Sequence, residues 1–278
     1  MKTNLIGISG KIGSGKDTVG KILQYLNSFN KYSNSNIKTL IEEDNATDIY
    51  RHFSNYQIKK YAGKLKDIVC LLIGCTREQL EDREFKNKEL GEEWSRTVWH
   101  IQSNHNRLDT YNSKEEAESD LSHYDENYNQ EVYIASEEIV MTPRLMLQLL
   151  GTEAGRQIIH PNVWVNALFA DYKKEWNGKT FFAHGIGREV REGVFPNWII
   201  TDVRFPNEVK AIQDRGGIVI RINRTAGSVL INNDTHSVTD HQHPSETALD
   251  YCNDFDYVIE NDGSIEDLID KVKQLNLV

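Results

Sequence analysis

The chain has 278 residues, of which 38% are hydrophobic, and it carries a formal net charge of −10. This length allows one large domain or two small ones, and the acidic balance argues against a general nucleic-acid binder. Three cysteines are too few for a disulfide framework or a cysteine metal site, so a cytosolic chain with free thiols is expected. No apolar stretch approaches the length of a membrane span and no signal peptide opens the chain, so no membrane partner is expected.

Residues 5–18 predict a strand, a glycine-rich loop and a helix, with the spacing Gly10-x4-Gly15-Lys16 of a phosphate-binding loop. Glycines let successive N–H groups point inward, and the start of the helix adds its N–H groups and a positive dipole end. We therefore expect a polyphosphate here; the alternative is a glycine-rich turn that binds nothing. The residues expected to bind it are Gly10, Lys11, Gly13, Ser14, Gly15, Lys16, Asp17 and Thr18.

Asp17 follows the loop lysine, where such loops usually carry Ser or Thr for Mg²⁺. A carboxylate there can hold the metal or orient the protonation of an acceptor phosphate. Its charge beside phosphates is unfavourable unless a metal or an arginine offsets it. Asp17 and Thr18 are therefore the predicted Mg²⁺ ligands, and Lys16 is the predicted cation for the β- and γ-phosphates.

Beyond the first helix, residues 27–36 are expected to be a loop, 37–41 a short strand and 56–62 a better strand, followed by an apolar helix up to Ile73. Lys64 and Lys66 lie at this strand-to-helix junction, where α/β proteins form ligand sites. Both are candidate substrate-binding residues, and the alternative is a solvated helix start.

Thr76 predicts the N-cap of the next helix, after which Arg83 is a further basic candidate for the substrate. Residues 95–131 are polar and lack clear helical or strand periodicity, so we expect a surface insertion there and not a separate domain. Residues 132–140 predict a short strand.

Thr142 and Pro143 predict an N-cap and a first helical position. Further helical stretches are expected over 152–159 and 161–176. Polar side chains on the first two of these helices suggest an anion or base site, against the alternative of solvated surface residues: Arg144, Gln148, Thr152 and Arg156.

Residues 181–194 predict a hairpin, and 198–202 an apolar strand that ends in Asp202, with Arg204 close behind. A carboxylate at the tip of a buried strand is the usual place for a second metal- or water-holding group. The alternative is that Asp202 caps the next helix, over 209–215.

The strand expected over 218–222 leads into Arg221 and Arg224, which are candidates to fold over a transferring phosphoryl group. A lid-like loop is expected over about 224–244. Its three histidines have the spacing His-x4-His-x-His, but no cysteine supports a zinc site.

Residues 257–260 predict the last strand, Asn261-Asp262-Gly263 a turn, and 264–275 the closing amphipathic helix. Strands that alternate with helices after a phosphate loop predict an α/β fold. We expect one domain over residues 1–278, with a mostly parallel central sheet and helices on both faces.

The chain also resembles the phage-type deoxynucleoside monophosphate kinases over nearly its whole length, apart from the polar middle. A phosphate loop alone is unspecific, whereas its Gly-Lys-Asp-Thr variant joined to Arg-Leu-Met-x-x-Leu-x-Gly-Thr is much more selective. The matching stretches are Ser9-Gly10, Ser14-Gly15-Lys16-Asp17-Thr18, Ala62-Gly63-x-Leu65-Lys66-Asp67, Arg144-Leu145-Met146-x-x-Leu149-x-Gly151-Thr152, Trp164-Val165, Thr201-Asp202-x-Arg204, His236 with Ser245-Glu246, and Asn261-Asp262-Gly263-Ser264.

The resemblance implies a P-loop kinase fold and transfer of the ATP γ-phosphate to a deoxynucleoside 5′-monophosphate, with Mg²⁺, in the host cytoplasm if the chain is phage-encoded. ATP and the monophosphate are then the expected partners, and neither nucleic acid nor a membrane is expected. The sequence does not decide whether the chain forms a homodimer. The expected catalytic residues are Lys16, Asp17, Arg221 and Arg224. Asn261, Asp262 and Gly263 are expected near adenine. The expected acceptor-side residues are Lys64, Lys66, Arg83, Arg144, Gln148, Thr152, Arg156, Asp202 and Arg204.

Three alternatives remain open from the sequence. One is another small-molecule P-loop kinase, similar to dephospho-coenzyme A kinase or phosphomevalonate kinase. The second is a non-catalytic nucleotide-binding regulator that docks a protein through its polar insertion. The third is a kinase of nucleic-acid ends, against which the acidic balance speaks.

Overall fold

The computed structural model describes residues 3–27, 34–42, 54–103, 106–127, 132–183, 188–224 and 247–277. The chain divides into two compact units, and each is described by itself. Unit 1 comprises Met1–Lys64 and Ile159–Val278, and unit 2 comprises Leu65–Ile158.

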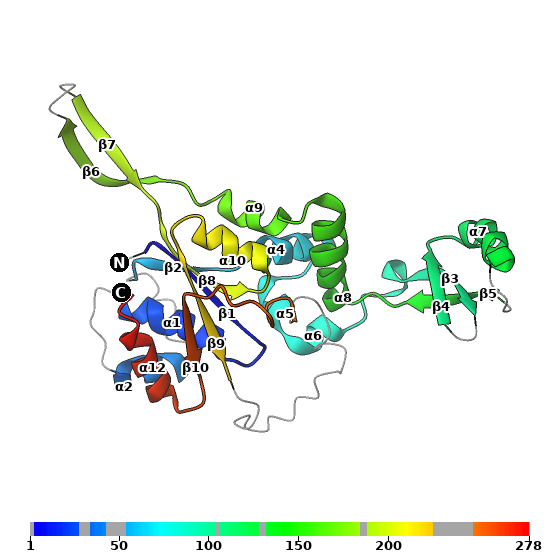
Figure 1. Ribbon diagram of the computed structural model, residues 1–278, viewed down its shortest axis with the longest axis horizontal. Helices are drawn as coiled ribbons and strands as arrows, with labels where there is room; N and C mark the ends of the chain where they lie inside the picture. Colours follow the sequence, from blue (N-terminus) through cyan, green and yellow to red (C-terminus); the bar gives the residue numbers. More distant parts are fainter. Residues whose placement is uncertain are drawn as a thin grey trace. The chain divides into compact units, whose positions relative to one another are not determined.

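Unit 1 contains the glycine-rich loop of residues 10–18 and most of the strands (Figure 1). Its elements are β1 (Leu5–Gly10), α1 (Lys16–Leu26), α2 (Asn34–Glu42), β2 (Tyr56–Lys59), α9 (Val163–Phe169), β6 (Glu175–Ala183), β7 (Arg188–Val194), β8 (Asn197–Val203), α10 (Pro206–Gln213), β9 (Ile218–Asn223), β10 (Tyr257–Glu260) and α12 (Ile265–Gln274).

Five strands of unit 1 form one sheet in the order β10-β9-β1-β8-β2, and every pair in it is parallel. Ile6 of β1 faces Ile199 of β8 on one side and Ile218 of β9 on the other. Because the strands are parallel, their carboxyl ends meet at one edge, where α/β proteins bind ligands. The predicted α/β fold with a mostly parallel sheet is confirmed.

Each face of this sheet packs against its own group of helices, as alternating strand residues require. Ile6 and Ile8 lie in a core with buried side chains of α1, α2 and α12. Leu5, one residue earlier, lies in a second core with side chains of α9 and α10. Figure 1 shows these two helix groups on opposite faces of the sheet. The prediction of helices on both faces is therefore also confirmed.

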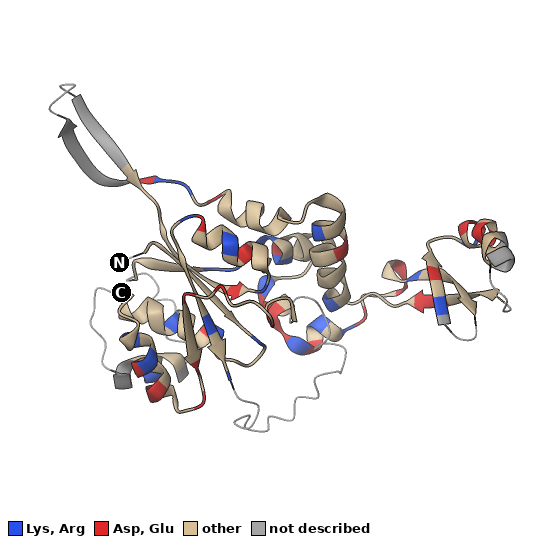
Figure 2. Cartoon of the chain, viewed as in Figure 1, with Lys and Arg blue, Asp and Glu red and all other residues tan. Residues whose placement is uncertain are grey.

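Capping residues place several helices where the sequence predicts them. The Thr142 side chain accepts a hydrogen bond from Leu145 N, and Pro143 follows at the first helical position. Ser264 caps α12 in the same way through Asp267 N, at 3.2 Å. Acidic residues fill the first turn of α12 and basic residues its last turn (Figure 2), which complements the helix dipole.

Two expected elements of unit 1 are wrong. Residues 37–41 belong to the helix α2 and not to a strand, because Ile37, Leu40 and Ile41 have helical spacing and pack into the first core. The helix expected over 161–176 ends at Phe169. Tyr172 lies beyond that end and stacks on Phe195, with ring centroids 4.9 Å apart.

Unit 2 is a group of helices with a small antiparallel sheet, and its first helix α4 begins just before the boundary. Its elements are α4 (Ala62–Ile73), α5 (Arg77–Glu81), α6 (Arg83–Asn87), the 3₁₀ turn η1 (Glu92–Trp94), β3 (Arg96–Ser103), β4 (Asn106–Tyr111), α7 (Lys114–Asn127), β5 (Val132–Ile139), α8 (Pro143–Gln148) and the π-helix η2 (Leu149–Ile159).

Residues 95–131, in which the sequence shows no clear periodicity, contain β3, β4 and α7, and β3 and β4 form an antiparallel sheet with β5 in the order β4-β3-β5. The strand pattern is hidden because the β3–β4 register shifts between Ile101 and Gln102. Among the described side chains of α7, only Ala117 is buried and Leu121, four residues later, is half-buried, so its apolar stripe is too short to stand out in the sequence. The division of the chain into one domain with an insertion stays a prediction.

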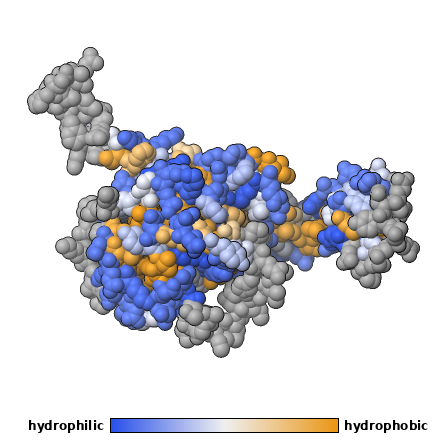
Figure 3. Space-filling model, viewed as in Figure 1, coloured by the Kyte–Doolittle hydropathy of each residue, from blue (hydrophilic) through white to orange (hydrophobic). Residues whose placement is uncertain are grey.

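Among the described residues, no helix is both long and apolar enough to cross a bilayer. The face seen in Figure 3 is largely hydrophilic, in keeping with the abundance of charged residues in the chain.

Candidate active site

The loop between β1 and α1 has the backbone that an anion site requires. Gly13 and Gly15 have φ angles of 75° and 93°, in the left-handed region that favours glycine. Gly15 is the N-cap of α1 and has no side chain to occupy the first amides of the helix. The helix start therefore directs its amide groups and its positive dipole end toward the loop.

The Ser14 hydroxyl lies inside this loop without a hydrogen-bond partner among the described residues. Ser14 is only 3% exposed, so this hydroxyl is buried. A buried hydroxyl without a partner is unfavourable unless a ligand or water satisfies it. A phosphate oxygen in the loop would supply an acceptor.

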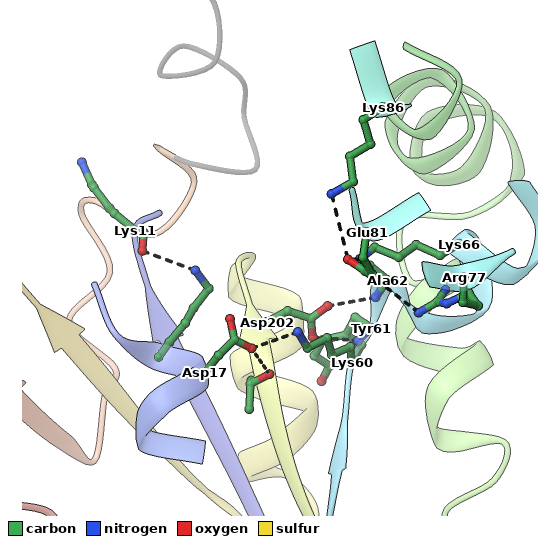
Figure 4. A network of polar contacts seen from close by, with 12 residues as sticks. Lys11, Asp17, Lys60, Tyr61, Ala62, Lys66, Arg77, Glu81, Lys86 and Asp202 are labelled. Atoms are coloured by element: carbon green, nitrogen blue, oxygen red, sulfur yellow. Dashed lines mark hydrogen bonds and ion pairs between the residues drawn. The ribbon is translucent and has the colours of Figure 1, made fainter. Parts of the chain in front are cut away.

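Lys16 lies over the same loop. Its side chain is largely buried, and its Nζ donates to the Lys11 carbonyl oxygen at 3.3 Å (Figure 4). The Lys11 side chain itself points to Asp250, with an ion-pair distance of 3.0 Å. Of the two lysines in the loop, only Lys16 thus places its ammonium group against the loop, whereas Lys11 contacts it through its backbone carbonyl.

Asn261, in the predicted turn after β10, forms a hydrogen bond to the loop between β1 and α1. Its Nδ2 donates to Ser14 O at 2.8 Å, and its backbone N donates to Asn223 O at 2.7 Å. The next residue, Asp262, is paired instead with Lys271 at 2.7 Å. Asn261 therefore fixes the shape of the loop, a role that the sequence did not predict.

Asp17 projects from the first turn of α1 and is bound by two donors. Lys60 Nζ and Thr201 Oγ1 both lie 2.9 Å from Asp17 Oδ1 (Figure 4). Burial acts to raise the pKa of Asp17, but Lys60, Thr201 and Lys16 outweigh it and hold the pKa below its usual value. The carboxylate is thus ionised at neutral pH. Lys60 is a site residue that the sequence reading missed, although it directly follows β2 at the ligand-binding edge of the sheet.

Asp202, at the end of β8, accepts two backbone hydrogen bonds from the start of α4. Tyr61 N lies 2.7 Å from Oδ1 and Ala62 N lies 3.0 Å from Oδ2 (Figure 4). Burial raises the pKa of this carboxyl group, while the two amides act to lower it. Asp202 therefore caps a helix, though not the following one that the sequence suggested.

The two candidate lid arginines have different surroundings. Arg221 Nη1 donates to Ser9 Oγ at 3.0 Å, and its guanidinium lies 5.5 Å from the ring centroid of Phe255. Arg224 is exposed, and its Nη1 donates to the Gly13 carbonyl oxygen at 3.2 Å. The structure thus brings Arg224 into contact with the phosphate loop itself. The rest of the expected lid, with its three histidines, lies outside the described residues.

A metal ion at this site would rely on few protein ligands. Among the residues that the structure describes, no three His, Cys, Asp or Glu side chains gather as a metal cluster. Mg²⁺ characteristically needs only one or two carboxylates, together with substrate phosphates and water. An ionised Asp17 beside Thr18 fits that requirement.

Two more predicted residues of unit 1 are engaged in local contacts. Lys64 forms an ion pair with Asp171 at 2.9 Å. Arg204 lies just before α10, and its backbone N donates to the buried Glu208 carboxylate at 2.7 Å. Neither contact involves the phosphate loop.

Unit 2 holds the other predicted acceptor-side residues. Lys66 donates to both Glu81 oxygens, and Arg144 Nε donates to Asn87 Oδ1 at 2.8 Å. Arg83 is exposed in the first turn of α6.

The π-helix η2 affects how the remaining polar candidates are arranged. Its i→i+5 hydrogen bonds widen the turn, so residues four apart stay closer to one face than in an α-helix. The half-buried residues at this spacing along α8 and η2 are Arg144, Gln148, Thr152 and Arg156. The sequence shows the spacing, but only the structure shows the change of helical period.

Comparison with known proteins identifies a family and two relatives. The family model described as "Deoxynucleotide monophosphate kinase" matches residues 4–272. The chain is similar to the deoxynucleoside-5′-monophosphate kinase of Escherichia phage T5, at 26% identity over 261 residues, which cover 88% of this chain and 84% of that protein. It is also similar to a putative deoxynucleotide monophosphate kinase of Acanthamoeba polyphaga mimivirus, at 30% identity over 146 residues, 49% of this chain and 65% of that protein.

Proposed function

The chain belongs to the deoxynucleotide monophosphate kinase family, and from this premise we propose that it transfers the γ-phosphoryl group of ATP to deoxynucleoside 5′-monophosphates. The products are deoxynucleoside diphosphates and ADP. The expected place of the reaction is the cytoplasm, of the host if the chain is phage-encoded. The observation that carries the donor assignment is the buried, unpartnered Ser14 hydroxyl inside a left-handed glycine loop at the start of α1.

The donor triphosphate binds along the loop from Gly10 to Thr18. Backbone amides at the start of α1 hold phosphate oxygens, and Lys16 neutralises their charge. Asn261 keeps the loop in shape through its hydrogen bond to Ser14 O. Asp262 and Gly263 remain candidates for contact with adenine.

Asp17 and Thr18 would hold Mg²⁺ through their oxygens. The metal would neutralise charge on the β- and γ-phosphates. Lys60 forms an ion pair with Asp17, which keeps the carboxylate ionised and fixes its orientation. Arg224 is the leading candidate to stabilise the charge of the transferring group, because it already contacts the loop at Gly13 O. Arg221, held by Ser9, is the second candidate.

The acceptor is already an anion, so catalysis consists mainly of positioning and charge neutralisation. Basic and polar side chains must hold its phosphate and its base. The residues proposed for this are Lys64, Lys66, Arg83, Arg144, Gln148, Thr152, Arg156, Asp202 and Arg204.

A panel of dGMP, dTMP, dCMP and dAMP with ATP and Mg²⁺ tests the proposal, with diphosphate formation as the readout. Lys16→Met is expected to reduce turnover by about 10²-fold or more, as for loss of one charge-stabilising group. The exposed Lys173→Met serves as the matched control and should keep wild-type activity.

Wild-type protein that forms no diphosphate from any of the four monophosphates would refute the proposal. Product from dephospho-coenzyme A or phosphomevalonate would then indicate another small-molecule kinase, and labelled oligonucleotide ends a nucleic-acid kinase. ATP binding without any transfer would point to a nucleotide-binding regulator.

A further inference from the structure

A cluster of charged side chains in unit 2 joins residues from three separate helices around one carboxylate (Figure 4). Lys66 Nζ lies 2.6 Å and 2.7 Å from the two oxygens of Glu81. Lys86 Nζ lies 3.9 Å from the same carboxylate, and Arg77 Nη2 lies 3.7 Å from it. The two lysine side chains are only 16% and 22% exposed, whereas the Glu81 side chain is 51% exposed, so their shared carboxylate is accessible from solvent.

The charges at this cluster are not balanced. Arg77 has a second acid, Asp67, at 3.3 Å, whereas Lys66 and Lys86 share Glu81. Burial lowers the pKa of Lys86, and repulsion from Lys66 and Arg144 lowers it further, against the attraction of Glu81 and Asp82. Asp82 is occupied as the cap of α6, where its Oδ1 accepts from Phe85 N at 2.7 Å.

Arg144 adds a fourth element, α8, to this arrangement. Its Nε donates to Oδ1 of Asn87, the residue next to Lys86. The positive charge of Arg144 is also one of the causes that lower the pKa of Lys86. Lys66 of α4 and Lys86 of α6 thus face one carboxylate, and Arg144 of α8 binds the residue next to Lys86, although repulsion between these cations opposes their assembly.

We propose that Lys66, Lys86 and Arg144 bind the phosphate of the deoxynucleoside monophosphate, and that Glu81 is the internal counter-ion which this phosphate displaces. The inference rests on the proposed kinase function and adds Lys86 and Glu81 to it. Neither residue belongs to the sequence motifs that indicate the kinase family.

The chemistry of a phosphate monoester suits this cluster. It carries close to two negative charges and three acceptor oxygens, so it can engage two ammonium groups and a guanidinium together. Glu81 carries one charge and two oxygens. It satisfies Lys66 but leaves Lys86 beyond hydrogen-bonding distance. A phosphate, with more charge and one more oxygen, would also engage Lys86, while an ionised Glu81 would repel it.

The test measures Kd of the best monophosphate substrate by calorimetry without ATP, and KM of both substrates in the full chain. Lys86→Met is expected to raise Kd and KM of the monophosphate about tenfold, the effect of one charge-assisted hydrogen bond, with KM of ATP unchanged. Lys88→Met removes the same charge from the exposed end of α6 and should match wild type. Lys86→Arg should restore most of the affinity.

Glu81→Gln gives the opposite expectation. It removes a charge that competes with phosphate, so monophosphate affinity should rise a few-fold. Equal effects of Lys86→Met and Lys88→Met, or weaker binding in Glu81→Gln, would overturn the phosphate-site inference and leave the kinase proposal standing. Wild-type protein that phosphorylates no monophosphate would instead refute the kinase proposal itself.

Discussion

Gly15→Ala tests whether the shape of the phosphate loop depends on a contact with the last strand of the sheet. Gly15 has a φ of 93°, which costs an alanine about 1–2 kcal/mol. A Cβ at this position would also lie 2.6 Å from Asn261 Nδ2. The Asn261 side chain must then move and lose its hydrogen bond to Ser14 O, which is worth about 1 kcal/mol. The expected total destabilisation is about 2–3 kcal/mol.

Gly13→Ala is the matched control within the same loop. Its φ of 75° carries the same kind of backbone strain, but no atom lies within 4 Å of the added Cβ. This variant should lose about 1–2 kcal/mol. The difference between the two variants therefore isolates the Asn261 contact.

The assay is urea unfolding of both variants in the wild-type and Asn261→Ala backgrounds. In the Asn261→Ala background the clash is absent, so Gly15→Ala should cost no more than Gly13→Ala. The expected coupling between Gly15→Ala and Asn261→Ala is about 1 kcal/mol. Equal costs of the two glycine substitutions in the wild-type background, together with strict additivity, would refute the assigned role of Asn261.

Two further predictions concern charge and core packing. Lys60→Met removes a cause of the lowered Asp17 pKa while burial still raises it, so the folded-state pKa should move up. The stability that ionised Asp17 adds above its unfolded pKa, near 3.8, is then reduced, so urea unfolding should show a smaller rise with pH in that region. The control Lys88→Met, which removes an exposed lysine, should keep the wild-type slope. Ile22→Ala leaves a cavity at a fully buried site between α1 and the sheet, and it should lower the free energy of unfolding by about 2–5 kcal/mol. The control Ile12→Ala removes an exposed side chain and should lower it by less than about 1 kcal/mol. A loss that small for Ile22→Ala would contradict the packing.

Local signals in the sequence predicted much of the fold. Glycine spacing with a lysine marked the phosphate loop, and Thr142 with Pro143 marked the start of α8, because capping and turn conformation depend on neighbouring residues. The resemblance built on such motifs is confirmed by the family match over residues 4–272. Where the local pattern is weak, as in β3 and α7, the elements were missed.

The sequence by itself determined the family and the parallel α/β class, and it predicted the phosphate loop, since each rests on short-range patterns. Only the tertiary structure decided which distant groups meet that loop. Lys60 reaches Asp17 because β2 and the start of α1 lie at one edge of the sheet, and Asn261 reaches Ser14 because β10 ends there too. Such contacts join residues separated by up to 247 positions, and they follow from strand order, which no local pattern specifies.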